Sequence, residues 1–229
     1  LPSCIITMSL LSALSHLPSS SSYSHLIASR PEGSQKLNPY LPLPASSTLF
    51  TDDKFIASLP SPPSSSVVHV LGAETVSVPK AENSLVLISR DAQEAYDHAL
   101  LALKVARSGT SVFHYIGSTA LTGSVQELAE AESWLESPVS PLLSGATDET
   151  DVAEEVLGRY EAAALSLLKL TRRAQRPFTH RSAESSKLIL NFLPSTSTAL
   201  EGQNVLDISV ASPLPRDKVR HAVKGNDGI

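Results

Sequence analysis

The sequence is poor in the residues that build many cofactor sites and nucleic-acid surfaces. Its 229 residues include one cysteine, Cys4, one methionine and one tryptophan, and aromatic residues make up only 5%. A single cysteine excludes an internal disulfide and a cysteine-ligated zinc or iron–sulfur site. The 18 Lys and Arg stand against 23 Asp and Glu, a formal net charge of −5. Because phosphate binding needs clustered cations, this balance argues against nucleic acid as a partner.

Long apolar runs and targeting features are also missing. No run reaches the roughly 18 residues that a membrane span needs, so no membrane association is expected. The first 29 residues contain no Asp, Glu, Lys or Arg. A secretory signal would need a basic segment before "IITMSLLSAL", and a transit peptide would carry arginine. We therefore expect a cytoplasmic protein, and its start at Leu1 rather than Met indicates a fragment or a processed product.

Proline and serine are concentrated near the start, in stretches such as "HLPSSSSYSHL" and "LNPYLPLPASS". Such segments have little capacity to form a core. Residues 1–45 are therefore predicted to be mostly irregular. A further change in composition, near residues 142–150, indicates a boundary between two α/β parts. We expect a first α/β domain over residues 46–145, and a helix with the beginning of a second α/β domain over residues 146–229.

Residues 84–117 have the pattern of a strand, a helix and a second strand. "SLVLIS" is a short continuous apolar run, typical of a strand covered on both faces. Asp91 can cap the following helix, with Glu94 completing a variant of the capping box, and Gly109 can end it. The predicted buried face of this helix consists of Ala92, Ala95, Tyr96, Ala99, Leu100, Leu103 and Ala106. "SVFHYI" then returns as a strand, which predicts a right-handed βαβ unit.

The surrounding pattern predicts an α/β fold with a parallel sheet and helices on both faces. The other predicted elements are a short helix in "TLFTDDKFIASL" capped by Thr51 or Asp52, a strand over Val67–Leu71, a helix in "SVQELAEAESWLES" capped by Ser124 and Glu127, a long helix over Asp151–Arg173, strands in "KLILNFL" and "NVLDISVAS", and a final helix in "PLPRDKVRHAV".

The histidines are scattered, without the i,i+4 spacing of a metal-binding helix. Most such histidines are structural or exposed, and His98 is expected to project into solvent. His114 differs, because it lies near the carboxyl end of a buried strand, where open parallel sheets bind ligands. The loop "GSTALTGS" after it could hold an anion at a helix N-terminus, but it matches no phosphate-binding pattern. An ordinary loop is therefore the favoured interpretation.

The order of the elements resembles a known family. The stretch "LVLISRDAQEAYDHALLALKVARSGTSVFHYIG" resembles the end of the pyrimidine-binding domain of 2-oxoacid:ferredoxin oxidoreductases. The stretches "LTRRAQRPFTHRSAESSKLILNFLPSTSTAL" and "NVLDISVASPLPRDKV" resemble the start of that family's next domain. Fungal NADPH sulfite reductases carry this thiamine-fold module without its original chemistry, and "SSTLFTDDKFIASL" fits the hemoprotein (beta) subunit best. The resemblance covers about residues 45–224.

This resemblance implies a parent enzyme that reduces sulfite to sulfide. Its implied cofactors are siroheme, a 4Fe–4S cluster, FMN or FAD, and NADPH, and its implied partners are the flavoprotein subunit and downstream domains. The chain departs from the family, because the glutamate that activates thiamine diphosphate and the four cluster thiolates are missing. We therefore expect no cofactor in this chain, no activity of the chain alone, and an assembly role in an oligomer. The alternative is a free-standing, non-catalytic interaction protein derived from such a domain.

The resemblance also implies a ligand- or partner-facing edge. The residues placed there are Ser89, His114, Tyr115, Gly117 and Ser118, and the rule for parallel sheets points to the same edge. Without the activating glutamate, this edge is expected to serve packing against a partner. No catalytic or metal-ligating residue is assigned.

Overall fold

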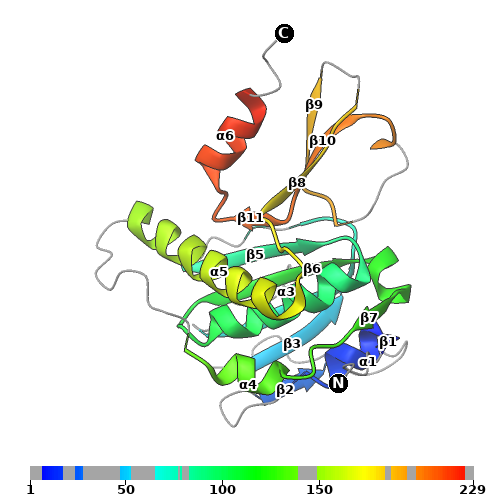
Figure 1. Cartoon of the computed structure of the whole chain (residues 1–229), viewed down its shortest axis with the longest axis vertical. Coiled ribbons are helices and arrows are strands. Elements are labelled where there is room, and N and C mark those ends of the chain that lie inside the picture. The colour runs from blue at the N-terminus through cyan, green and yellow to red at the C-terminus, as the bar shows by residue number, and fades with distance from the viewer. Residues whose placement is uncertain are drawn as a thin grey trace.

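A computed structural model of the chain shows a mixed α/β protein with a six-stranded sheet and a three-stranded sheet (Figure 1). It describes residues 7–17, 24–27, 47–52, 65–76, 78, 83–138, 149–183, 187–194 and 200–224. The strands of the larger sheet are β2 (Ser24–Ile27), β3 (Ser47–Asp52), β4 (Val67–Ala73), β5 (Ser84–Ser89), β6 (Ser111–Gly117) and β11 (Val210–Ser212). None of the described helices is long and apolar enough to cross a bilayer.

The predicted βαβ unit lies within the larger sheet. β5 and β6 are adjacent and parallel, and α3 (Ala92–Ala106) connects them. The strands lie in the order β11-β5-β6-β4-β3-β2, and all are parallel except β11, which pairs antiparallel with β5. The expectations of an α/β fold and of a mostly parallel sheet are therefore confirmed. The strand predicted over Val67–Leu71 is also present and extends to Ala73.

α3 begins where its capping residues predict. The Asp91 carboxylate accepts a hydrogen bond from the backbone N–H of Glu94 at 2.8 Å. The Glu94 carboxylate accepts one from the backbone N–H of Arg90, also at 2.8 Å. These bonds satisfy backbone donors that have no partner within the helix. The predicted apolar face is buried, and so is every other residue from Ala95 to Ala106.

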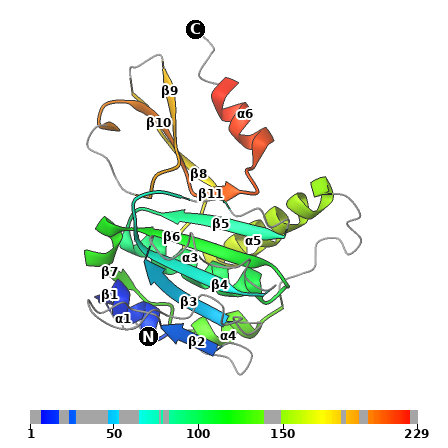
Figure 2. The same cartoon turned by 180° about the vertical axis from the view of Figure 1, so that it is seen from behind.

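The described helices that contact the larger sheet cover only one of its faces (Figures 1 and 2). These helices are α1 (Leu10–Ser15), α3, α4 (Ala131–Glu136) and α5 (Glu149–Thr171). Leu85 and Leu87 of β5 point toward them, whereas Val86 between them belongs to a separate cluster with Phe113 on the opposite face. No described helix residue lies in that second cluster. The expectation of helices on both faces is therefore wrong for the described part of the chain.

The start of the chain contains ordered elements where the sequence predicts irregular structure. β1 (Thr7–Ser9) pairs antiparallel with β7 (Ser124–Gln126), and α1 follows β1 directly. The prediction is wrong within residues 7–17 and 24–27, while the rest of residues 1–45 lies outside the described part. The uncharged run at the start is apolar enough to supply a core helix, and a serine caps it instead of marking a linker.

Two predicted helices also differ from the structure. In place of one helix after Ser124, β7 is followed by a turn, and α4 begins only at Ala131. Ser124 and Glu127 do not cap a helix there, because pairing with β1 takes up the strand residues. Thr51 and Asp52, predicted as caps, end β3, and the helix expected after them lies outside the described residues.

The later elements agree with the sequence except for one missed strand and one strand that is divided. The long predicted helix is α5, and β9 (Leu188–Asn191) and α6 (Arg216–Lys224) are also present as predicted. The single strand predicted in "NVLDISVAS" is two strands, β10 (Asn204–Ile208) in the smaller sheet and β11 in the larger one. The missed strand is β8 (Phe178–Arg181), which pairs antiparallel with β10, while β9 pairs with β10 in parallel. These three strands and α6 enclose a small core of their own.

The burial of α1 leads to a test of the N-terminal correction. Leu10 is fully buried and its neighbour Leu11 is 49% exposed. We expect Leu10→Ala to lower the free energy of unfolding by about 2–5 kcal/mol, because it leaves a cavity in the main core. Leu11→Ala is the matched control and should change it by about 0.5 kcal/mol or less. Equal unfolding midpoints in urea for the two variants would show that α1 does not belong to the core.

Candidate functional site

Ser89 lies between two histidines in the core of the larger sheet. It is the last residue of β5, and its hydroxyl is 2.8 Å from Nδ1 of His98 on α3 and 2.8 Å from Nε2 of His114 on β6. All three residues are fully buried. Alternation along β5 and β6 turns Ser89 and His114 toward the helix face of the sheet, and the cap at Asp91 fixes where α3 places His98.

The hydrogen-bonded chain continues to a third histidine. His69 of β4 is opposite His114 in the register of the sheet, and their Nδ1 atoms are 3.0 Å apart. One of these nitrogens must donate and the other accept, so the tautomer of one ring determines that of the next. Ser89 has a single hydroxyl proton, so the tautomer of His114 also determines that of His98. In the series of hydrogen bonds from His69 through His114 and Ser89 to His98, all donors therefore point in the same direction.

The surroundings keep two of these rings neutral. Burial lowers the pKa of His98, against the smaller opposing effect of Glu94 and Asp97. Burial, with repulsion from His69 and His98, holds the pKa of His114 well below its ordinary value. Tyr160 of α5 lies over His98 with ring centroids 6.5 Å apart, and burial raises its phenol pKa. His98 Nε2 and the Tyr160 hydroxyl have no hydrogen-bond partner within the described residues.

A serine hydroxyl bonded to an imidazole is the arrangement of an activated nucleophile. Here the hydroxyl and both rings are fully buried between the sheet and α3, so a substrate cannot reach them in this conformation. The hydrogen bonds among Ser89 and the histidines stabilise the fold. They join β4, β5, β6 and α3 through polar groups that would destabilise the core if they were buried without partners.

The five residues predicted for the edge are distributed over different places. Ser89 and His114 lie together, but inside the core. Tyr115 is fully buried in the cluster on the opposite face of the sheet. Gly117 ends β6, and Ser118 begins the short 3-10 helix η1 (Ser118–Thr122) with an exposed side chain. Of the five, Ser118 is thus the one with an exposed side chain at this edge.

Sequence reasoning missed His69 and His98 as members of the site. His98 is buried instead of solvated, because α5 and the sheet cover α3 from both sides. The alternation of His69 and His114 with buried valines and aromatics was the available signal for an inward orientation. The two histidines meet because β4 lies next to β6, and the pattern of each strand alone does not predict this strand order.

The carboxyl edge of the sheet is occupied by this chain itself. Arg90, directly after β5, donates from one guanidinium nitrogen to the carbonyls of Asn191 at 3.0 Å and Ile208 at 2.9 Å. The Ser209 hydroxyl donates to the Glu94 carboxylate at 2.9 Å. The smaller sheet is therefore docked at the end of β5, where ligands bind in many open parallel sheets.

The loop after β6 has a packing role. A Cβ on Gly123 would come within 2.5 Å of the Cβ of Ala92, so the glycine allows η1 to approach the first turn of α3. The Thr119 hydroxyl donates to the carbonyl of Arg90 at 3.2 Å. These contacts agree with the interpretation of "GSTALTGS" as an ordinary loop.

Within the described residues, no group of three or more His, Cys, Asp or Glu is arranged to hold a metal ion. No protein-family model matches the chain, and no curated protein matches it.

The neutral histidines predict an acid-sensitive fold. When the pKa of a histidine is lower in the folded than in the unfolded chain, the unfolded chain binds its proton first, and stability falls as the pH drops below the ordinary value of about 6.5. We expect a loss of up to about 1.4 kcal/mol per pH unit for each such histidine. The measurement is urea unfolding at several pH values between 7.5 and 5.5.

His98→Asn keeps a hydrogen-bonding group near Ser89 but cannot titrate, so it should reduce the pH slope. His221→Asn is the control, because His221 is exposed on α6 and the substitution should leave the slope unchanged. A free energy of unfolding that stays constant across this range would contradict the assignment of buried neutral rings.

Proposed function

We propose that this chain is a non-catalytic assembly module and that its parent is an assimilatory NADPH sulfite reductase, which reduces sulfite to sulfide. The burial of Ser89 is the observation that carries the first part. The most reactive arrangement among the described residues, a serine between two imidazoles, is fully buried and stabilises the fold. The surface of the chain, rather than this interior site, is then available for interaction.

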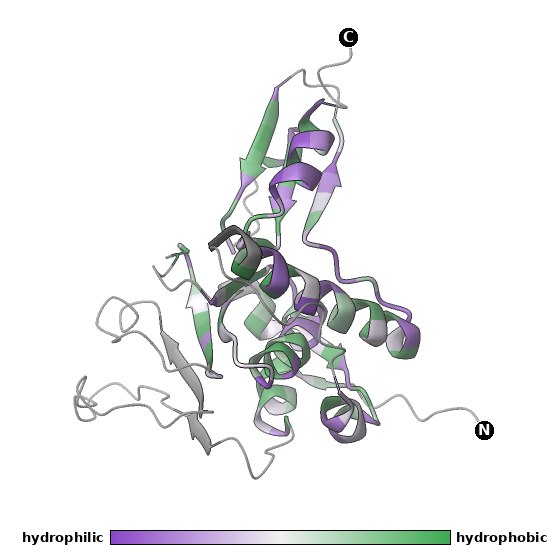
Figure 3. Ribbon diagram, turned by 90° about the vertical axis from the view of Figure 1, so that its left-hand side faces the viewer, coloured by the Kyte–Doolittle hydropathy of each residue, from purple (hydrophilic) through white to green (hydrophobic). Residues whose placement is uncertain are grey.

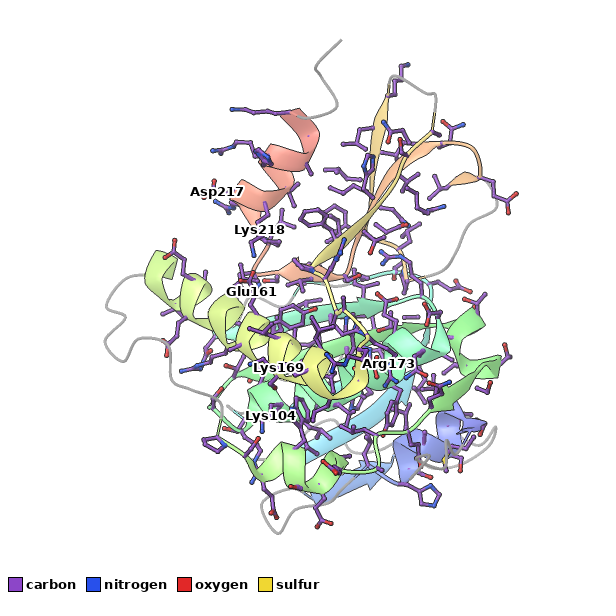
Figure 4. All side chains as sticks on the ribbon, in the orientation of Figure 1. Lys104, Glu161, Lys169, Arg173, Asp217 and Lys218 are labelled. Atoms are coloured by element: carbon purple, nitrogen blue, oxygen red, sulfur yellow. The ribbon has the colours of Figure 1, made fainter. Side chains whose placement is uncertain are left out.

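The parentage rests on the resemblance of the βαβ stretch and of the segments that follow it. The arrangement of those segments is compatible with a docked module. Arg173 follows the end of α5 (Figure 4). It forms a bidentate contact with the buried Asp97, at 2.7 and 2.8 Å, and Gln175 donates to the same carboxylate at 2.8 Å. The segment between the two sheets is thereby fixed on α3, which suits a scaffold with a defined outer surface.

In this proposal the redox chemistry belongs to other parts of the parent. Siroheme, the 4Fe–4S cluster, the flavins and NADPH would be bound by downstream domains and by the flavoprotein subunit. This chain would contribute shape and charge to the assembly. The alternative is a free-standing interaction protein with the same fold and no oxidoreductase partner.

Genetic disruption separates these two possibilities. If the parent is a sulfite reductase, loss of the gene should prevent growth on sulfate or sulfite as the sole sulfur source and should leave growth on sulfide or methionine unchanged. Normal growth on all four sources would overturn the parentage and favour the free-standing interaction protein.

The non-catalytic part has its own test. A fluorophosphonate probe labels activated serines, and the native chain should remain unlabelled because Ser89 is fully buried. The control is a serine hydrolase treated in the same tube. Labelling that disappears in Ser89→Ala would show that the serine is accessible and reactive, and would contradict the assignment.

A further inference from the structure

α6 and α4 lie at opposite ends of the longest axis of the molecule (Figures 1 and 2), and their sequences give them opposite charge. α6 lies at one end and is largely hydrophilic (Figure 3). α4 lies at the other end. The C-terminal part of the chain, which includes α6, is also the more positive part. Residues 169–229 contain ten of the 18 Lys and Arg but only five of the 23 Asp and Glu.

The outer face of α6 is a column of cations. Arg216, Arg220 and Lys224 follow one another at i, i+4 and i+8 and are all exposed. Within the described residues, Arg216 and Lys224 form no ion pair, and Arg220 has only a 3.6 Å contact with the exposed Asp217. Like charges four residues apart repel each other and destabilise a helix.

The cation of α6 on its inner side is already paired. Lys218 forms an ion pair with Glu161 of α5, between the two helices (Figure 4). Val219 is buried in the core of the smaller sheet. The orientation of α6 is therefore set by its inner contacts, and the cation column is left facing outward.

The outer face of α4 is a column of carboxylates. Glu132 and Glu136 are four residues apart, Glu130 precedes them, and all three are exposed. Glu136 lies in the last turn, where the helix dipole disfavours a negative charge. Lys104 and Arg107 of α3 donate to backbone carbonyls at the end of α4, and within the described residues they form no ion pair with these carboxylates. The acidic column is uncompensated among the described residues.

We propose that these two columns bind each other between copies of this chain, α6 of one copy against α4 of the next. The occupant is a second copy because the chain itself presents both charges at opposite ends. Within the described residues, the only ion pair of either column is the 3.6 Å contact of Arg220 with Asp217. Each contact would relieve the like-charge repulsion within both helices. Since the two surfaces differ, the contact is heterologous and builds a closed ring or an open filament.

Such a contact must be sensitive to salt. Exposed ion pairs contribute little each, so the association is weak and depends on several pairs acting together. At about 0.05 M salt we expect the sedimentation coefficient of the purified chain to rise with protein concentration, and at about 0.5 M we expect it to return to the monomer value, because screening shortens the range of these interactions. A monomer at every concentration and salt level would overturn the proposal.

Charge reversal makes the test specific. Arg220→Glu with Lys224→Glu, or Glu132→Lys with Glu136→Lys, should each weaken self-association by about tenfold or more, because like charges then face each other. Mixing the two double variants should restore it, because each then presents one surface that matches the other. Failure of the mixture to associate, with both variants folded by circular dichroism, would also overturn the proposal.

The controls change the same number of charges elsewhere. Arg172→Glu with Arg176→Glu, and Glu154→Lys with Glu201→Lys, alter exposed residues outside both columns and should leave the association unchanged. Equal weakening in the controls would mean that net charge, not the two columns, governs association.

The contact between α6 and α4 would provide the surface for the assembly role proposed above. Only the biological role of this contact rests on that proposed function. The two fail separately, because growth on sulfite tests the parentage and sedimentation of the purified chain tests the surface. Normal self-association with normal growth would leave a self-assembling interaction protein.

Discussion

The complete burial of α3 is the constraint on which the rest of the structure depends. Every residue from Ala95 to Ala106 is buried, and that run includes the polar side chains of Asp97, His98 and Lys104. A buried polar or charged group destabilises a fold unless it is paired. Each of the three therefore fixes a different neighbour. Asp97 holds Arg173 after α5, His98 bonds to the serine at the end of β5, and Lys104 donates to the carbonyls that end α4.

These contacts determine how the outer parts of the chain are placed. The pairing of Asp97 sets where the chain leaves α5 and enters β8, and Arg90 then holds the smaller sheet by its backbone carbonyls. The smaller sheet has a separate apolar core, and the charge-assisted hydrogen bonds of Arg90 attach it to the end of β5. At α4, burial and the positive charge of Arg107 lower the pKa of Lys104 to about 8, while the carbonyl acceptors favour its charged form.

Local patterns predicted the βαβ unit well, because its strands are short apolar runs and Asp91 with Glu94 specifies the start of α3. The predictions are wrong where contacts between residues far apart in the sequence determine the local structure. Residues after Ser124 pair with β1 at the other end of the sequence, which overrides their helical capping pattern. The sequence predicts His98 in solvent because a helix pattern reveals one apolar face, whereas burial from a second side depends on α5. It predicts Ser89 and His114 at the edge of the sheet, but both lie in its core, where strand order and register bring the histidines together.

The reactive side chains lie in the core and the charged columns lie on the surface, so ionic strength affects the two to different extents. The buried histidines of the core are expected to make the fold sensitive to acid from about pH 6.5 downward, because the unfolded chain then binds protons that the folded chain does not. A loss of association on acidification would therefore report on the stability of the core as well as on the surface. Salt at neutral pH acts mainly on the surface, since it screens exposed charges strongly and buried ones much less. Ionic strength is thus the variable that separates the assembly surface from the histidine core that holds it in place.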